Sequence, residues 1–280
     1  MILLAYTGQM GLSFIYTSFS SAWAPAIRGT RRSAPGNAVP SLPALACPLW
    51  GNAFPAPGSC PPFPLTTHGN GTKNSLMGKT LRLNASAFHF NYKGYQGSQF
   101  TSATSSGSGV FNVGDAKIFG LEGNATALVG QDTRINLNAT SLYTKFGDGI
   151  TINTGASTPV AIDISGNRLP NAPDFTASGG VEQEIPVSWG KFTARINAKY
   201  SSAFYYSVLN TADTQSKEYV LANASLKFAP AESFWKIQGY VRNVFNKQVL
   251  ANANQNFNAG ANIYEFQTPR TFGVRGSVKF

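Results

Sequence analysis

Residues 192–200 read Phe-Thr-Ala-Arg-Ile-Asn-Ala-Lys-Tyr and alternate between apolar and polar side chains. Successive side chains of an extended chain point to opposite faces, so this period of two predicts a β-strand. One face carries Phe192, Ala194, Ile196, Ala198 and Tyr200, and the other carries Thr193, Arg195, Asn197 and Lys199. The segment therefore predicts a strand with one apolar face and one polar face.

The same alternation recurs on both sides of this segment and predicts eight strands in total. The other seven cover residues 81–92, 119–129, 135–140, 175–185, 220–228, 235–242 and 272–280. In the first of them, the apolar positions change phase between Ala87 and Phe88. A change of phase within one strand predicts a β-bulge at that point.

The connections between these strands alternate in length. Short ones centre on Gly130–Asp132, Ser188–Gly190 and Pro230–Glu232, whereas long ones cover residues 97–114, 147–171, 207–216 and 247–268. Short turns at one end, long loops at the other and strands of about ten residues are typical of a transmembrane β-barrel. A soluble β-sandwich is the alternative, but its wet face would carry more charge and its strands would be shorter.

The composition excludes several other classes of protein. Charged residues make up 12% of the chain, about half the usual share, so exposed helix faces rich in Glu and Lys are not expected. No run of 18 apolar residues predicts a membrane-spanning helix. The net charge is +10, but basic residues occur singly and the longest run is Arg31-Arg32, so no nucleic-acid partner is expected.

The first 76 residues differ from the rest. They hold 10 of the 16 prolines and both cysteines but no Asp or Glu, whereas residues 77–280 hold all 12 acidic residues. Ala22-Trp23-Ala24 is similar to a signal-peptide cleavage site, yet no basic residue precedes Arg28. We therefore expect two parts: a disordered, Pro-rich leader of out-of-frame or misjudged origin at 1–76, and a β-domain at 77–280.

The β-domain offers little for catalysis. His89 is its one histidine and no Cys/His/Asp/Glu cluster has metal-ligand spacing, so we expect no catalytic, cofactor-binding or metal-binding residues. Glu182 and Glu184 share the polar face of one strand, and we expect them to pair with Arg195 and Lys199 of the next strand. The chain is therefore not expected to be an enzyme.

Residues near the C-terminus carry a family resemblance. The last strand has Phe272, Val274, Gly276, Val278 and the terminal Phe280 on one face, and resembles the closing strand that the bacterial barrel assembly machinery reads. Asn243-Val244-Phe245-Asn246-Lys247, a loop and then Pro269-Arg270 resemble the end of a TonB-dependent receptor. Further similar stretches are Ile118–Gly123 and Leu169–Pro173, so the resemblance covers roughly residues 78–280.

The resemblance implies an all-β, antiparallel transmembrane barrel of the bacterial outer membrane, of which about eight C-terminal strands are present. Barrels of this family have 22 strands and a plugged lumen, so the plug and the part that contacts TonB would lie outside this chain. The intact receptor would import a scarce ligand such as a ferric siderophore, and this part alone would not function. The expected partners are outer-membrane lipid and the assembly machinery. A self-contained eight-stranded barrel with a structural or passive role remains the alternative.

Overall fold

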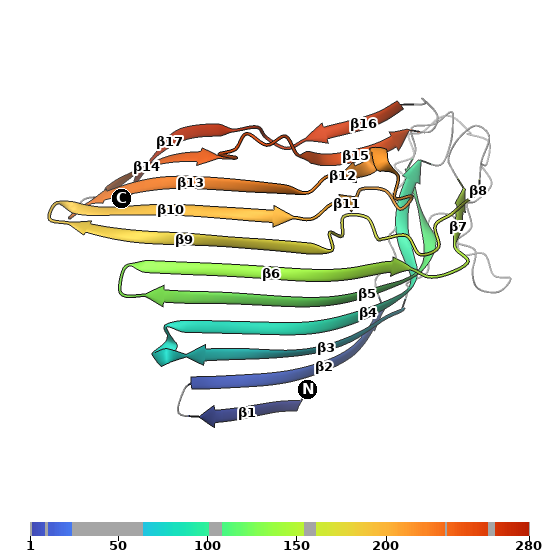
Figure 1. Cartoon of the computed structure of the whole chain (residues 1–280), viewed down its shortest axis with the longest axis horizontal. Coiled ribbons are helices and arrows are strands. Elements are labelled where there is room, and N and C mark those ends of the chain that lie inside the picture. Colours follow the sequence, from blue (N-terminus) through green and yellow to red (C-terminus); the bar gives the residue numbers. More distant parts are fainter. Residues whose placement is uncertain are drawn as a thin grey trace, which may run out of the picture.

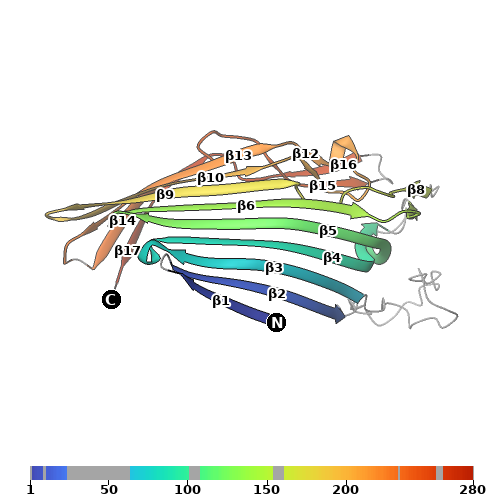
Figure 2. The ribbon, with the colours of Figure 1, turned by 60° about the horizontal axis from the view of Figure 1, so that its bottom comes forward.

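The computed structural model describes residues 2–8, 11–23, 64–100, 108–153, 161–232, 234–256 and 261–279. Within these residues, eleven strands form one antiparallel sheet in the order β1-β2-β3-β4-β5-β6-β9-β10-β13-β14-β17. The strands are β1 (Ile2–Gly8), β2 (Gly11–Trp23), β3 (Pro64–Leu76), β4 (Leu81–Phe100), β5 (Ser108–Val129), β6 (Thr133–Phe146), β9 (Phe175–Val187), β10 (Gly190–Ser201), β13 (Tyr219–Pro230), β14 (Trp235–Arg242) and β17 (Thr271–Val278). The sheet is curved, and β1 and β17 form its two edges (Figures 1 and 2).

Three small sheets lie at one end of the long strands, on the right in Figure 1. They pair β7 (Thr151–Asn153) with β8 (Ala161–Asp163), β11 (Phe204–Tyr205) with β12 (Gln215–Ser216), and β15 (Leu250–Asn256) with β16 (Ala261–Phe266). Two short 3-10 helices, η1 (Met77–Lys79) and η2 (Ala212–Thr214), complete the elements. No helix among the described residues is long and apolar enough to cross a membrane.

All eight strands predicted from the alternation are present, as β4, β5, β6, β9, β10, β13, β14 and β17. The short connections are confirmed as turns, for example between Val129 and Thr133. The expected long loop at 97–114 is wrong in extent, because β4 and β5 continue as a hairpin to Phe100 and Ser108. Backbone pairing extends this hairpin through a Ser- and Gly-rich stretch in which the side chains show no alternation.

The bulge in β4 lies further along the strand than the sequence predicts. Pairing with β5 is continuous from Leu81↔Ala127 to Tyr92↔Ala116, and the register shifts only between Tyr92 and Tyr95. Phe88, Phe90 and Tyr92 therefore lie on the face opposite to Leu83. They form an aromatic row in which the Phe88 and Phe90 ring centroids are 5.0 Å apart. Because apolar residues occupy both faces at this end of the strand, no bulge is needed to keep the pairing.

The expectation that the first 76 residues have no partner strands is wrong for β1, β2 and β3. β3 pairs with β4 from Leu65↔Tyr92 to Leu76↔Leu81, β2 pairs with β3, and β1 pairs with β2. Backbone hydrogen bonds make these pairs whatever the side chains are, and the one proline in the three strands, Pro64, begins its strand, where proline is tolerated. The remaining prolines of the leader, and the expectation of disorder at 24–63, lie outside the described residues.

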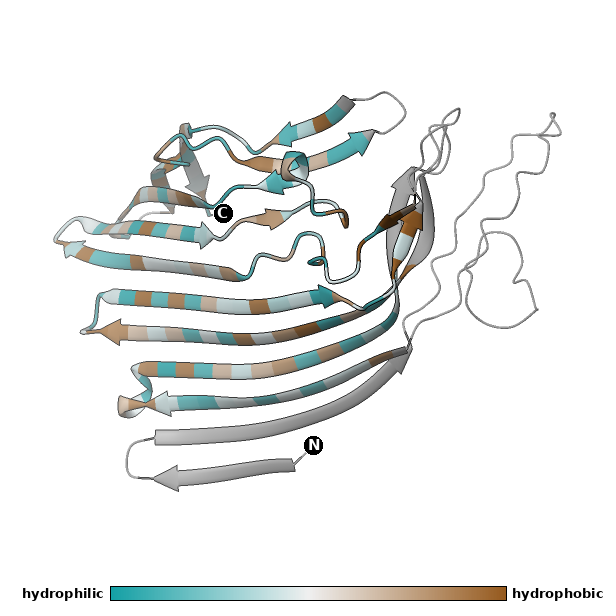
Figure 3. Cartoon of the chain, turned by 45° about the vertical axis from the view of Figure 1, so that its right-hand side comes forward, coloured by the Kyte–Doolittle hydropathy of each residue, from teal (hydrophilic) through white to brown (hydrophobic). Residues whose placement is uncertain are grey.

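The sheet has an apolar face and a polar face, and Figure 3 shows the alternation along its strands. On the apolar face, the register places Leu83, Ala125, Leu137, Gly179 and Ala198 in one row across β4, β5, β6, β9 and β10. Many large apolar side chains of this face are exposed, including Leu121, Leu137, Val181, Ile196, Leu226, Phe272 and Val274. We call it the outer face and the polar one the inner face.

Buried side chains gather at the end of the long loops rather than between two layers. Val113, Ala116, Phe146, Ile150 and Ile164 form a cluster where β5 and β6 meet the β7–β8 hairpin. Phe146 and Ile164 are among the largest fully buried side chains of the described chain. The long loop between β6 and β9 is therefore anchored by packing and is an ordered part of the fold.

Candidate functional site

Amide and carboxylate side chains on the inner face are joined by cross-strand hydrogen bonds. Asn84 Nδ2 donates to Asn124 Oδ1 at 2.8 Å, and Ser86 Oγ donates to Glu122 Oε1 at 2.9 Å. These side chains line a shallow hollow of about 330 Å³ with Asn138 and Thr140 of β6. The hollow is open and polar, as expected of a wall that faces water rather than lipid.

The acidic residues of β9 pair with basic residues on both neighbouring strands. Glu182 lies 3.9 Å from Arg195 of β10 and 4.0 Å from Arg134 of β6, whereas Glu184 lies 2.9 Å from Lys191. The expected partner Arg195 is confirmed, but the expected partner Lys199 is wrong. The register places Lys199 opposite Ser178, too far along the strand to reach either carboxylate. Arg134 is 45 residues or more away in sequence, so local pattern could not identify it.

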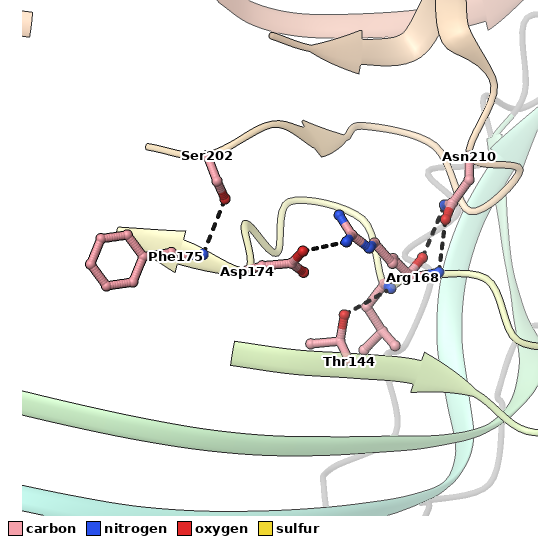
Figure 4. A network of polar contacts seen from close by, with 7 residues as sticks. Thr144, Arg168, Asp174, Phe175, Ser202 and Asn210 are labelled. Atoms are coloured by element: carbon pink, nitrogen blue, oxygen red, sulfur yellow. Dashed lines mark hydrogen bonds and ion pairs between the residues drawn. The ribbon is translucent and has the colours of Figure 1, made fainter. Parts of the chain in front are cut away.

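A polar network holds the loop before β9 against the loop after β10 (Figure 4). The Arg168 guanidinium pairs with Asp174, and the Arg168 backbone amide donates to Asn210 Oδ1 at 2.7 Å. Asn210 Nδ2 donates back to the Arg168 carbonyl at 3.0 Å, and the Leu169 amide donates to Thr144 Oγ1 at 3.2 Å. The network joins loops that the sequence alone does not bring together, and no sequence signal identified its members.

Asp213 of η2 joins a second pair of loops. Gln255 Nε2 of β15 and Asn262 Nδ2 of β16 donate to its carboxylate at 2.9 and 2.6 Å. Hydrogen bonding with Thr211, then with Gln255 and Asn262, holds the pKa of Asp213 below its ordinary value of 3.8, although partial burial acts in the opposite direction. The ionised carboxylate therefore fastens the β15–β16 hairpin to the loop after β11.

The predicted motif at 243–246 forms a turn that ends β14. Asn243 is 6% exposed and has a φ of 50°, a left-handed conformation that asparagine tolerates well. Its Nδ2 donates to the Lys247 carbonyl and its Oδ1 accepts from the Lys247 amide, both at 2.9 Å. The Val244 amide donates to the Ala222 carbonyl at 2.8 Å. Phe245, in contrast, is largely exposed.

The second part of the motif returns to this turn from across the long loop. The backbone amide of Arg270, which follows Pro269, donates to Asn246 Oδ1 at 3.0 Å, and its guanidinium donates to the Val244 carbonyl at 3.4 Å. The structure thus brings together five of the six predicted motif residues, Asn243, Val244, Asn246, Pro269 and Arg270, at one corner. Sequence reasoning missed their inner-face neighbours Asn197 and Asn223, although both lie on the polar side of their strands.

The predicted assembly-signal residues share one face of β17. Phe272, Val274, Gly276 and Val278 lie on the outer face, opposite Val241, Gly239, Ile237 and Trp235 of β14. Phe272 is 82% exposed and Val274 72% exposed, as expected of side chains directed at lipid. Among the described strands, β17 pairs only with β14. Phe280 lies outside the described residues, and the assembly role of this face stays a prediction.

No chemistry-bearing cluster accompanies these features in the described part of the chain. No group of three His, Cys, Asp or Glu side chains there could hold a metal ion. His89 lies on the outer face of β4, opposite His68 of β3 and Phe119 of β5, rather than at a bulge. The organised features are a curved sheet with a polar inner wall, an apolar outer wall and anchored long loops.

A comparison with protein families assigns residues 70–244, more than half of the 280-residue chain, to "TonB dependent receptor-like, beta-barrel". The chain belongs to this family. TonB-dependent receptors are outer-membrane transport proteins and are not enzymes. This receptor barrel is therefore an outer-membrane protein, as expected from its C-terminal motifs. A comparison with curated proteins gave no match.

Several solved structures share the fold of this receptor barrel. The ferric yersiniabactin uptake receptor FyuA from Yersinia pestis is 17% identical with a TM-score of 0.71, and the match covers 96% of this chain and 37% of FyuA. The siderophore receptor PiuA from Acinetobacter baumannii is 18% identical with a TM-score of 0.67, and the match covers 97% and 34%. The copper transporter OprC is 16% identical with a TM-score of 0.62, and the match covers 96% and 37%. The chain spans about a third of these proteins, and at such identities the likeness concerns the fold alone.

Proposed function

We propose that the chain is the C-terminal part of a receptor that imports a scarce ligand, such as a ferric siderophore, across the bacterial outer membrane. The observation that carries the proposal is a curved sheet with a lipid-compatible outer face and a polar inner face, which spans about a third of siderophore receptors such as FyuA and PiuA. In the complete protein, the remaining strands would close the barrel and a plug would fill it. The TonB system would act through that other part.

The free edge of β17 supports the view that the chain is part of a larger barrel. Its outward backbone groups pair with no described strand, and lipid does not tolerate unpaired backbone groups. The eight strands from β4 to β17 form an even number, so another even number of antiparallel strands would join the two edges. Fourteen more strands would complete a barrel of 22. This barrel would depend on the assembly machinery and on outer-membrane lipid.

We further propose that the barrel proper begins near residue 77 and that residues 1–76 are of separate origin. β3 continues the sheet through its backbone but not through its side chains. On the outer face, Asn74, Thr72 and Asn70 of β3 lie opposite Leu83, Ala85 and Ala87 of β4. A lipid-facing strand needs apolar residues at these positions. The apolar band therefore ends at β4, while pairing continues into β3.

A self-contained eight-stranded barrel is the competing proposal. Because β4 and β17 run in opposite directions, their edges could pair without a parallel junction. In the structure, however, the edge of β4 is occupied by β3 and β17 is not paired with β4. No observation favours closure over extension.

Refolding two versions of the protein would test the two proposals together. The full chain and residues 77–280 are refolded in neutral detergent, and their mass and protease resistance are compared. The receptor-part proposal predicts associated or aggregated species from residues 77–280, because two edges remain unsatisfied. A monodisperse, protease-resistant monomer from residues 77–280 would contradict it and support the small barrel. Reading the DNA upstream of the Met77 codon in all frames is the matching genetic test, and the proposal predicts further alternating strands and a plug.

A further inference from the structure

The inner face carries a group of positive charges near the short-turn end of the last three strands of the sheet. Lys227 of β13 lies opposite Gln238 of β14, and Gln238 lies opposite Arg275 of β17. One row nearer the turn, Lys236 lies opposite Ser277. We call Lys227, Lys236 and Arg275 the basic row.

The described chain offers no carboxylate to the basic row. β10, β13, β14 and β17 contain no Asp or Glu. The acidic residues nearest in the sheet, Glu182 and Glu184 of β9, are paired with Arg134, Arg195 and Lys191. No ion pair of the described residues includes Lys227, Lys236 or Arg275. This arrangement contrasts with β9 and β10, where each carboxylate has a basic neighbour.

Like charges at this spacing repel one another. Neighbouring strands lie about 4.8 Å apart, so Lys227 and Arg275 are separated by about 10 Å at the backbone. That separation is close to one Debye length at physiological salt, so solvent ions screen the repulsion only partly. Lys236 and Arg275 are both exposed, so a partner can reach them. The row is therefore stabilised by any partner that brings negative charge to it.

We propose that the basic row is a docking surface for an acidic polypeptide segment inside the barrel, near the short turns. This inference rests on the proposed function, because it takes the inner face to line the barrel interior. Short turns mark the periplasmic end of such barrels, so a ligand that arrives from outside meets the long loops first. A polypeptide that fills the lumen contacts both ends, and a chain of Asp or Glu residues matches three cations spread over three strands.

Binding of a labelled acidic peptide to the full refolded chain tests the proposal. The probe is fluorescein-labelled deca-glutamate, its binding is followed by anisotropy in neutral detergent, and deca-lysine is the control peptide. We expect saturable binding of deca-glutamate that weakens as salt rises from about 50 to about 300 mM. K227Q and R275Q should each weaken binding by about threefold to tenfold. The matched control, K117Q, removes an exposed lysine from the outer face at the loop end and should leave binding unchanged.

The competing outcomes would overturn the inference. Equal binding of deca-lysine, or unchanged affinity in K227Q and R275Q, would contradict it. Competition by free citrate as effective as that of deca-glutamate at equal carboxylate concentration would assign the row to small anions instead. As a second measurement, R275Q should raise the urea midpoint of the unliganded chain because it relieves repulsion, and a lower midpoint would contradict the premise. Failure here leaves the refolding and upstream-DNA results unchanged, so the two proposals fail separately.

Discussion

The side-chain carbonyl of Asn223 in β13 accepts a hydrogen bond of 3.0 Å from the backbone amide of Asn243, the residue that follows β14. Asn223 Nδ2 in turn donates to Asn197 Oδ1 of β10 at 2.9 Å. Three asparagines thus join three neighbouring strands at the point where β14 ends. Asn243 also holds Lys247 through its side chain, so the same residues that resemble the family motif close the corner to β15.

Replacing Asn243 by alanine should destabilise the barrel. The change removes two hydrogen bonds to Lys247 from a buried position and places a residue that disfavours the left-handed conformation at a φ of 50°. We expect a loss of about 1–3 kcal/mol in the free energy of unfolding, measured by urea titration in detergent. Gln248→Ala, at an exposed position in the same segment, is the control. Equal stability of the two variants would show that the turn does not depend on Asn243.

Gly120 should tolerate no side chain. A Cβ at this position would meet the Phe88 ring and approach Leu142 Cδ2 to 2.9 Å, and Phe88 is itself stacked on Phe90. Gly120→Ala should therefore cost about 1–3 kcal/mol through overpacking, read from the thermal or urea midpoint. Gly276→Ala is the matched control, because a Cβ there meets no atom within 4 Å. A tolerated Gly120→Ala would mean that the aromatic row moves freely.

Two neighbouring residues of β6 test the assignment of the faces. Ala139 lies on the outer face between Gly123 and Ala177, whereas Thr140 lies on the inner face opposite Glu122. Ala139→Arg should cost about 2–4 kcal/mol of stability in lipid, the range for arginine at the bilayer midplane. Thr140→Arg should cost much less, because it faces water and a carboxylate. Folding free energies in lipid vesicles would report the difference, and the reverse order would show that the faces are exchanged.

Acid should release the β15–β16 hairpin from η2. Because the pKa of Asp213 is lowered in the folded state, its stabilising effect is complete above its ordinary value of 3.8 and is lost as the pH falls through the lower folded value. Hydrogen exchange of residues 250–256, corrected for the intrinsic rate, should therefore accelerate below about pH 3.8. Asp213→Asn should accelerate exchange already at pH 5. Asp148→Asn, at an exposed position in another loop, should not, and equal effects would argue against the Asp213 contact.

The terminal aromatic should be needed for assembly. In a full-length receptor that ends in this strand, Phe280→Ala or its deletion should reduce insertion into the outer membrane without reducing synthesis, because it removes the end of the apolar face formed by Phe272, Val274, Gly276 and Val278. Heat-modifiable mobility on gels measures the folded fraction. Ser277→Ala, on the inner face of β17, is the control. An unchanged folded fraction in both variants would exclude a role for Phe280.

Local alternation was sufficient to determine the eight strands from β4 to β17 and their two faces. In an extended chain, the direction of each side chain depends only on its position, so Ile196 and Asn197 are assigned to opposite faces without any knowledge of neighbours. The C-terminal motif likewise identified Asn243, Asn246 and Arg270, and the structure shows that these residues meet at one corner. These features follow from the sequence because their physical causes are local.

Only the tertiary structure decided the features that depend on which strands are neighbours. Composition set the first 76 residues apart, yet β3 joins the sheet, because strand pairing uses backbone groups that every residue except proline provides. Glu182 contacts Arg134 as well as Arg195, because β6 and β9 become neighbours across a long loop. The unpaired basic row also became apparent only when the register placed Lys227 and Arg275 in line across β14. Register across a sheet is a long-range property, and a single strand carries no record of its partner.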